Sequence, residues 1–412
     1  MKNKRTPDIR FEGFTRDWEQ RRLSEVSERV RGNDGRMDLP TLTMSASAGW
    51  LDQRERFSGN IAGNEQKNYT LLSVGELSYN HGNSKLAKYG VVFKLRTFKE
   101  ALVPRVYHSF KTTKDANADF IEYMFETKLP DRELGKLVSS GARMDGLLNI
   151  NYDDFMGIKI KLPTIQEQEK IGIFLRDLDN LITLHQQELT TLKQTKQGFL
   201  QKMFPKEAES VPEVRFPGFT GDWEERKFKD DIVSIQTGTN LLGSKSNGGT
   251  PLIKMGNIQR GYFSLDKLEY LDDSEIVSEL DIINNGDFLF NTRNTLELVG
   301  KGATWFYESG KYAFNSNIAR FTFKNINTYF FNYLYNTEQV IRQVRARAVG
   351  TTSVAAVYPR DLNSMKYMVP SIEEQSEIGN FFRQLDYTIT LHHRELEALK
   401  EAKKAFLQKF FV

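Results

Sequence analysis

The feature that most constrains this chain is an internal duplication. A short aromatic segment at residues 7–19 (PDIRFEGFTRDWE) recurs at residues 212–224 (PEVRFPGFTGDWE), 205 positions later. A second block at residues 163–204 recurs at 370–411, 207 positions later, with 24 identities among 42 aligned positions. Because the two offsets agree within two residues, the whole chain of 412 residues consists of two copies of one unit.

The duplicated terminal blocks predict two long helices. From Ile171 to Met203, and again from Ile378 to Phe410, stripe positions follow one another at spacings of three and four, and all are apolar except one histidine and one lysine in each copy. We expect the first helix to run from about residue 166 to 203. A single apolar stripe of this length needs a partner, and the economical partner is the duplicate helix, packed antiparallel in a coiled coil. His185 and His392 hold the same position in the two stripes, and we interpret them as markers of coiled-coil register.

Between its aromatic segment and its helix, each unit has a middle region that diverges from the other copy. β-rich runs at 90–95, 157–162, 287–290 and 318–323, with helical stretches at 118–128 and 328–343, indicate mixed structure. The fold class we predict is α+β, with two pseudo-symmetric mixed α/β domains joined by the two antiparallel helices. The predicted boundaries are 1–162 and 205–369 for the domains, and 163–204 and 370–412 for the helices.

Composition excludes several classes of protein. The chain has no cysteine and five histidines, so disulfide frameworks, cysteine nucleophiles and cysteine-based metal sites are excluded, and we predict no metal site. No apolar run is long enough to span a bilayer, and the charged N-terminus is not followed by an apolar core, so we expect a cytoplasmic protein without membrane contact. A net charge of +3 permits nucleic-acid binding without arguing for it.

Catalytic motifs are also missing from the sequence. The segment from Gly238 to Lys245 resembles a phosphate-binding loop, but Ser244 precedes Lys245, which inverts the order that the mechanism needs. No cluster of histidine and carboxylate recurs in both copies, although a shared frame is where a catalytic site is expected. We therefore predict no catalytic residues and a chain that is not an enzyme by itself.

The order of these elements resembles a known family. An aromatic segment (Pro7–Glu19), a variable middle, an L-P-x-x-x-E-Q-x-x-I motif (Leu162–Ile171) and a long helix occur twice, as in the specificity subunit of type I restriction–modification enzymes. The second copy has Val369 in place of the leucine. The resemblance covers essentially the whole chain.

The resemblance implies a non-catalytic, sequence-specific DNA-binding subunit. Each middle would be a target recognition domain that reads one half of a bipartite, asymmetric site in double-stranded DNA, and the helices would set the gap between the halves. Two adenine-N6 methyltransferase subunits and two restriction subunits, which act as motor and nuclease, would dock on it. S-adenosylmethionine, ATP and Mg would be bound by those partners, and this chain would bind no cofactor.

Loops rich in Arg, Lys, Asn, Gln, Ser and Thr are the candidate DNA contacts, because these side chains read base edges and hold phosphates. In the first middle the candidates are Ser45, Ser47, Asn80, His81, Asn83, Lys85 and Arg143. In the second they are Lys254, Asn257, Gln259, Arg260, Asn291, Arg293, Asn294, Arg345, Arg347, Thr351 and Thr352. Trp18 and Trp223 recur in the shared frame and are expected to be core residues rather than base-stacking ones.

Two other readings stay open on the sequence. The chain is alternatively a coiled-coil scaffold whose two modules bind proteins without recognising DNA, or an enzyme such as a fused nuclease. DNA binding that weakens with added salt separates the first alternative from a specificity subunit, and a metal-dependent cleavage assay decides the second.

Overall fold

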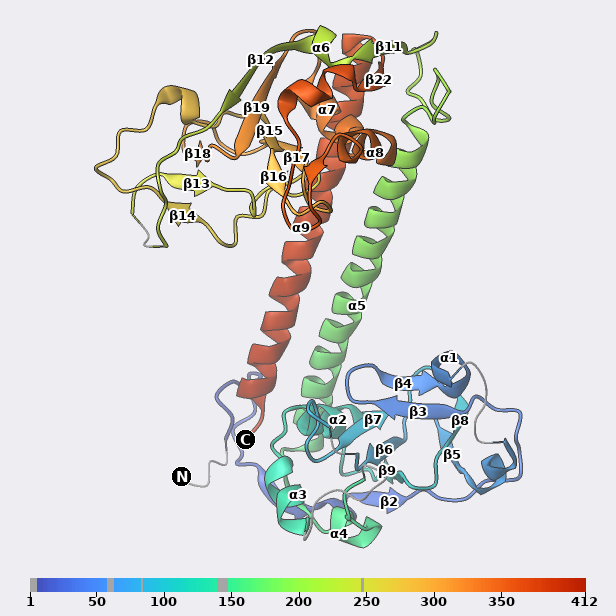
Figure 1. Cartoon of the computed structure of the whole chain (residues 1–412). Coiled ribbons are helices and arrows are strands. Elements are labelled where there is room, and N and C mark those ends of the chain that lie inside the picture. The colour runs from blue at the N-terminus through green and yellow to red at the C-terminus, as the bar shows by residue number, and fades with distance from the viewer. Residues whose placement is uncertain (1–5, 58–62, 83, 139–146, 246–247) are drawn as a thin grey trace. The chain divides into compact units, whose positions relative to one another are not determined.

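The computed structural model describes residues 6–57, 63–82, 84–138, 147–245 and 248–412 (Figure 1). The chain forms two compact units. The first unit runs up to Gln186 and also contains Arg394–Val412, and the second comprises Gln187–His393. Both long helices are therefore divided between the units, so that each helix contributes one part to the first unit and the other part to the second. The boundaries placed at 162, 204 and 369 from the sequence treat the helices as separate segments and stay a prediction.

The two long helices have nearly the predicted bounds. Helix α5 spans Ile165–Lys202 and α9 spans Ile372–Phe410. Each begins just after a proline, which favours an extended residue before it and so limits the helix on its N-terminal side. The two helices run antiparallel in both units. In the first unit Phe174 packs against Phe406, and in the second Phe199 packs against Phe381.

The first unit contains the strands β1 (Glu19–Arg22), β2 (Ser27–Arg29), β3 (Leu42–Ser45), β4 (Gly49–Asp52), β5 (Thr70–Ser73), β6 (Leu77–Asn80), β7 (Val91–Lys94), β8 (Glu100–Val103), β9 (His108–Thr112) and β10 (Lys159–Leu162). Its shorter helices are α1 (Gln53–Phe57), α2 (Ala118–Glu126), α3 (Asp131–Leu137) and α4 (Tyr152–Met156).

The second unit contains the strands β11 (Glu224–Lys227), β12 (Ile232–Thr237), β13 (Pro251–Ile253), β14 (Glu269–Tyr270), β15 (Phe288–Asn291), β16 (Arg293–Asn294), β17 (Gly302–Thr304), β18 (Ala313–Phe314), β19 (Ile318–Phe323), β20 (Val349–Gly350), β21 (Ala355–Ala356) and β22 (Lys366–Val369). Its shorter helices are α6 (Phe228–Asp231), α7 (Thr328–Tyr335) and α8 (Glu338–Arg345).

The same four-stranded antiparallel sheet stands at the centre of each unit. Its order is β2-β9-β6-β7 in the first unit and β12-β19-β15-β17 in the second. Strands β6 and β15 are equivalent, and each follows a glycine with positive φ, Gly75 (92°) and Gly286 (90°), a conformation that favours glycine. A second shared element is a two-stranded ribbon, β1 with β10 and β11 with β22. The predicted α+β class and pseudo-symmetric pair of mixed domains are confirmed.

The aromatic segments belong to the cores of the two units. Trp18 packs against Phe120, at a ring separation of 5.5 Å, and against Phe411 at the end of α9. In the second unit Trp223 packs in the same way against Phe330, at 5.8 Å, and Phe204. Both tryptophans are 3 % exposed, which confirms them as core residues.

One predicted helix differs from the structure. The stretch 328–343 was expected to be continuous, but it forms α7 and α8, separated by Asn336 and Thr337. The Asn336 side-chain amide donates to the carbonyls of Asn332 and Gly302, so it ends α7 and ties it to β17. Among the described residues, no helix is long and apolar enough to cross a membrane.

Candidate nucleic-acid interface

A buried ion pair holds each aromatic segment on the start of a long helix. The guanidinium of Arg10 donates two hydrogen bonds to the Glu167 carboxylate, at 2.8 and 2.6 Å. Arg215 and Glu374 repeat the arrangement, with both distances 2.6 Å. The hydrogen bond that the guanidinium donates to Glu167 raises the pKa of Arg10, so Arg10 stays charged. These bidentate pairs explain the acidic residue of the repeated motif.

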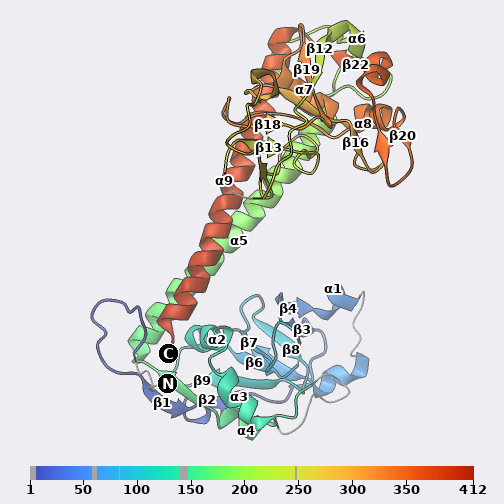
Figure 2. The ribbon, with the colours of Figure 1, turned by 60° about the vertical axis from the view of Figure 1, so that its left-hand side comes forward.

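The glutamine of the same motif attaches the recognition domain to the helix. The Gln168 carbonyl oxygen accepts from the backbone N–H of Asn117, the N-cap of α2, and its amide donates to the carbonyl of Pro163. Gln375 makes the equivalent bonds to Asn327, at the start of α7, and to Pro370. In Figures 1 and 2, α2 lies beside α5, and α7 lies beside α9.

A second repeated contact holds α2 and α7 in place further along the two long helices. The Tyr123 hydroxyl donates to Asp179 at 2.8 Å, and Lys403 forms an ion pair with the same carboxylate at 2.7 Å. In the second unit Asp386 accepts from Tyr333 at 2.9 Å and pairs with Lys196. Each recognition domain is therefore attached to its helices by the same two joints, so its position does not depend on its variable loops.

The predicted register histidines occupy equivalent positions in their units. His185 Nδ1 lies 3.8 Å from Glu395 in the first unit, and His392 Nδ1 lies 3.6 Å from Glu188 in the second. Both rings are half-buried on the helix pair, at 19 % and 24 % side-chain exposure. Their role in setting register stays a prediction.

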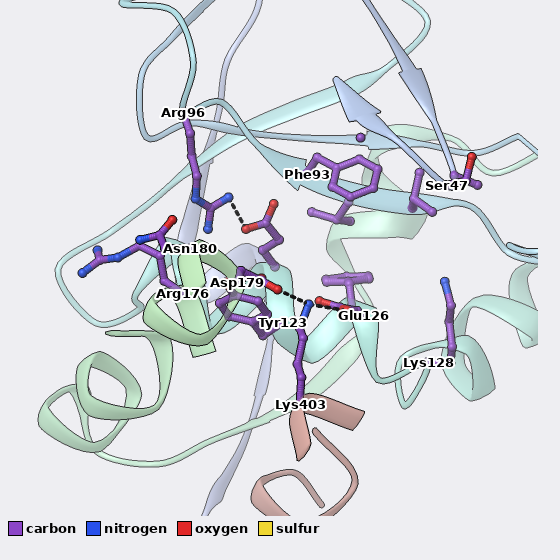
Figure 3. Close-up of a pocket in the computed structure, with 16 residues that line it drawn as sticks. Ser47, Phe93, Arg96, Tyr123, Glu126, Lys128, Arg176, Asp179, Asn180 and Lys403 are labelled. Atoms are coloured by element: carbon purple, nitrogen blue, oxygen red, sulfur yellow. Dashed lines mark hydrogen bonds and ion pairs between the residues drawn. The ribbon is translucent and has the colours of Figure 1, made fainter. Parts of the chain in front are cut away.

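A groove of about 330 Å³ lies in the first unit where β7 and α2 meet the long helices (Figure 3). Several charged side chains line it, but they neutralise one another. Arg96 pairs with Asp119 and Glu122, and Lys403 pairs with Glu126 and Asp179. Ser47, from the turn after β3, and Lys128 are also in its wall. Because its described cations are mostly paired, the groove is a joint between domain and helices rather than a phosphate site.

The candidate DNA contacts of the first unit come from two hairpins. Ser45 ends β3 and the exposed Ser47 lies in the turn between β3 and β4, with their hydroxyl oxygens 3.1 Å apart. Lys85 is exposed in the connection between β6 and β7. Asn80 is half-buried, and its side-chain oxygen accepts from the Gly82 N–H. Asn83 and Arg143 lie outside the described residues.

His81 is buried beside a second histidine. It is 4 % exposed, and its ring centroid lies 4.9 Å from that of His108. His108 is bonded to the carbonyl of Ile150 at 2.9 Å, and burial lowers its pKa to about 4. Both histidine rings pack at a tilt against Tyr79, which stacks on Phe155 in the core of the domain. The ring of His81 is therefore buried beneath the connection between β6 and β7 rather than exposed on its surface.

In the second unit, three predicted segments converge. Strand β16 pairs with β21, which also pairs with β20, so Arg293 and Asn294 join the loop that contains Thr351 and Thr352. The Leu296 N–H donates to the Thr352 carbonyl at 3.1 Å. Figure 2 shows β16 and β20 beside α8, at whose end Arg345 lies. We call β16, β20, β21 and the residues between β20 and β21 the exposed ribbon.

The third segment, residues 254–260, lies next to the exposed ribbon and is held by hydrogen bonds of buried side chains. Asn257 and Asn291 are buried at 6 % and 0 % exposure, and their side chains bond to nearby backbone groups. Lys254 forms an ion pair with Glu269 at 2.9 Å. Arg347 donates to the carbonyl of Gln343 and to the Ser364 hydroxyl. The remaining candidates are Arg293, Asn294, Thr351 and Thr352 on the ribbon, with Arg260 and Arg345 beside it, whereas both ends of the Gln259 amide are bonded within the domain.

Sequence reasoning missed three positions. Lys301 donates to the Gln259 side-chain oxygen at 2.6 Å, but nothing in its local sequence distinguishes it. Gly172 and Gly379 lie where α5 approaches α2 and where α9 approaches α7. A Cβ at Gly172 would lie 2.8 Å from Asn117 Oδ1, and one at Gly379 would lie 2.7 Å from the Phe330 nitrogen. Because Gly172 and Gly379 hold the same position in the two copies, their recurrence was the sequence signal that could have identified them.

Comparison with known proteins agrees with this geometry. Residues 64–194 and 220–401 both match the family described as the type I restriction modification DNA specificity domain. The chain belongs to this family. Each of the two matched stretches covers most of one recognition domain and a large part of the long helix that follows it. The family's DNA specificity domain is therefore present twice.

Relatives of this DNA specificity family are similar over part of their length. The type I restriction enzyme MjaVIII specificity subunit of Methanocaldococcus jannaschii is 24 % identical over 285 residues, covering 66 % of this chain and 65 % of that protein. The EcoKI specificity subunit of Escherichia coli K12 is 23 % identical over 280 residues, covering 65 % and 58 %. The matches thus span less than two thirds of these curated relatives.

A solved structure shares the fold. The S subunit of a type I restriction-modification system from M. genitalium has a TM-score of 0.61 and 12 % identity, and covers 99 % of both chains. At this identity the likeness shows the fold alone.

Proposed function

We propose that this chain is the non-catalytic specificity subunit of a type I restriction–modification complex. Each recognition domain reads one half of a bipartite, asymmetric DNA target, and the long helices set the gap between the halves. The observation that carries the proposal is that one DNA specificity domain matches each copy, while the frame is repeated and the exposed loops differ. A repeated frame with two different surfaces suits two different half-sites.

The same proposal includes the partners of the complex. Two methyltransferase subunits, which hold S-adenosylmethionine, and two restriction subunits, which use ATP and Mg, dock on the repeated frame. A frame present twice offers each kind of partner two equivalent surfaces, which supports a stoichiometry of two. We place the complex in the cytoplasm, where its DNA is.

The experiment selects duplexes from a randomised library with the full chain, alone and in complex with the methyltransferase subunit of its system. We expect an enriched motif with two separated halves. Arg293→Ala should relax the preference in one half only, at a cost of about 1–3 kcal/mol per lost base contact. Lys85→Ala, in the other unit, is the matched variant and should affect only the other half.

Several outcomes would contradict the proposal. Selection of a single uninterrupted motif, or both halves relaxed by Arg293→Ala, would overturn the assignment of one half-site to each domain. Absence of DNA binding by the chain and by its complex at 50 mM salt would favour the alternative of a protein-binding scaffold.

A further inference from the structure

Three cations of the second unit meet without a carboxylate among them. Arg260 follows β13, Lys301 immediately precedes β17, and Arg345 ends α8. Within the described parts of the chain, none of the three forms an ion pair; Lys301 donates to Gln259 and Arg345 donates to the carbonyl of Glu297. One guanidinium nitrogen of Arg260, Nη2, is buried and has no hydrogen-bond partner among the described residues.

The backbone brings the three residues together. The N–H of Gly261, next to Arg260, donates to the carbonyl of Gly302, next to Lys301, at 3.0 Å. Gly300, on the other side of Lys301, lies against Val344, the neighbour of Arg345. Burial, and after it the charge of Arg345, lowers the pKa of Arg260. Burial, and after it the charge of Arg260, lowers the pKa of Lys301. Like charges gathered in a partly desolvated place are unfavourable unless an anion completes the site.

Other partly buried cations of this unit are neutralised in the usual way. Arg320 pairs with Asp287 at 3.0 Å, Arg226 with Asp231 at 3.2 Å, and Lys254 with Glu269 at 2.9 Å. Within the described residues, Arg260, Lys301 and Arg345 therefore have no carboxylate partner, whereas Arg320, Arg226 and Lys254 each have one.

The cluster adjoins the exposed ribbon. The backbone of Lys301 accepts from the Asn291 N–H, and Asn291 is separated from Arg293 of β16 by one residue. Arg345 contacts Glu297, and the neighbouring Leu296 is bonded to Thr352. Side chains able to read base edges thus lie next to an unneutralised positive site, the arrangement in which phosphate contacts position a protein and base contacts specify the sequence.

We propose that Arg260, Lys301 and Arg345 form a phosphodiester-binding site that anchors the DNA backbone beside the exposed ribbon. This inference rests on the proposed function and deepens it. The ligand is one or two backbone phosphates of the half-site that the second domain reads. The site supplies affinity without sequence preference, whereas the ribbon supplies sequence preference.

The test measures DNA affinity of the full chain by fluorescence anisotropy between 50 and 200 mM salt, on a duplex with the selected motif and on an unrelated duplex. The variant Lys301→Gln/Arg345→Gln removes two cations that are at least partly accessible, and Arg260→Gln provides an independent probe. Lys311→Gln is the matched control, because Lys311 is an exposed cation of the same unit that pairs with Glu308 at 2.7 Å. Circular dichroism and unfolding curves verify that each variant folds.

We expect the slope of log affinity against log salt to become shallower by about 0.9 for each lost phosphate contact, hence by about 2 for the double variant. Over this fourfold salt range the wild type should lose roughly tenfold more affinity than the double variant. Both duplexes should be affected equally, and Lys311→Gln should keep the wild-type slope.

A slope equal to that of Lys311→Gln in both the double variant and Arg260→Gln would overturn the inference while leaving the proposed function intact. Altered preference for bases, with an unchanged slope, would assign these cations to base reading and also overturn it. Saturable binding of inorganic phosphate at micromolar concentrations, with no change in DNA affinity, would assign the cluster to a soluble phosphate. If the wild-type chain binds neither duplex, the proposed function itself is wrong.

Discussion

Gly172→Ala tests whether the recognition domain is fastened directly to the long helix. In an open helix the change from glycine to alanine stabilises by about 1 kcal/mol. At Gly172 the added Cβ would lie 2.8 Å from Asn117 Oδ1, 3.0 Å from Asp119 Cβ and 3.2 Å from the backbone nitrogen of Phe120. The first of these atoms is the N-cap acceptor of α2, bonded to the Phe120 N–H at 3.0 Å. The substitution therefore forces α2 away from α5.

Three contributions determine the expected free-energy change. Overpacking a close contact costs about 1–3 kcal/mol. Disturbing the N-cap adds about 1 kcal/mol to the destabilisation, and the higher helix propensity of alanine offsets it by a similar amount. We expect Gly172→Ala to lower the free energy of unfolding by about 1–3 kcal/mol. Gly198→Ala is the control, because a Cβ at Gly198, in the same helix, would meet nothing within 4 Å, so this variant should be stabilised by up to about 1 kcal/mol.

Urea unfolding of the full chain followed by circular dichroism measures the difference between the two variants. Because the chain has two units that can unfold separately, hydrogen exchange of peptides from α2 locates the effect. Gly379→Ala should produce the same change at α7, where its Cβ would lie 2.7 Å from the Phe330 nitrogen. A Gly172→Ala protein at least as stable as Gly198→Ala, with unchanged exchange in α2, would refute this account of the joint.

The remaining predictions concern charge, pH and length. Glu167→Gln leaves Arg10 without its buried partner and should destabilise the first unit by about 3 kcal/mol in urea unfolding; a loss below about 1 kcal/mol would contradict the role given to this pair. The pKa of His108 is about 4 in the folded protein, and about 6.5 is expected when it is unfolded. The unfolded state therefore binds more protons between these values, and the contribution of His108 to stability is lost as pH falls from 6.5 to 4. His108→Phe should flatten the pH dependence of unfolding in this window, and an unchanged slope would argue against it. Seven residues added to both long helices, after 186 and after 393, lengthen each by roughly 10 Å, which corresponds to about three base pairs. The gap in the selected motif should widen while both halves keep their sequence, and an unchanged gap would exclude the helices as its determinant.

The frame could be predicted from the sequence because its signals are local and repeated. Spacings of three and four placed the first helix at about 166–203, and α5 spans Ile165–Lys202. The β-rich run predicted at 287–290 coincides with most of β15, which spans Phe288–Asn291. The predicted helix at 328–343 was wrong in its continuity, since the break depends on hydrogen bonds from Asn336 to the distant Gly302.

The candidate site was harder to predict because it depends on contacts between distant segments. Composition singled out Arg260, Arg293 and Arg345 as members of loops, but Arg293 lies in β16 and Arg345 ends α8, and composition gave no reason to place the three on one surface. Lys301 was missed because its significance comes only from its neighbours in space. Asn291 has a residue type that suits adenine recognition, yet in the structure it is fully buried and fixes the turn before Arg293.

The two joints explain how one frame supports two different surfaces. Gln168 and Asp179 hold α2, and Gln375 and Asp386 hold α7, through residues that recur at nearly constant offsets. None of these contacts involves the exposed ribbon of the second unit, or the turn after β3 in the first. Loops that read DNA can therefore change without moving the helices that carry them, whereas a change at a joint shifts the whole domain. Divergence confined to the middles is the pattern that such an attachment permits, because these hydrogen bonds come from α2, α7 and their N-caps rather than from the exposed loops.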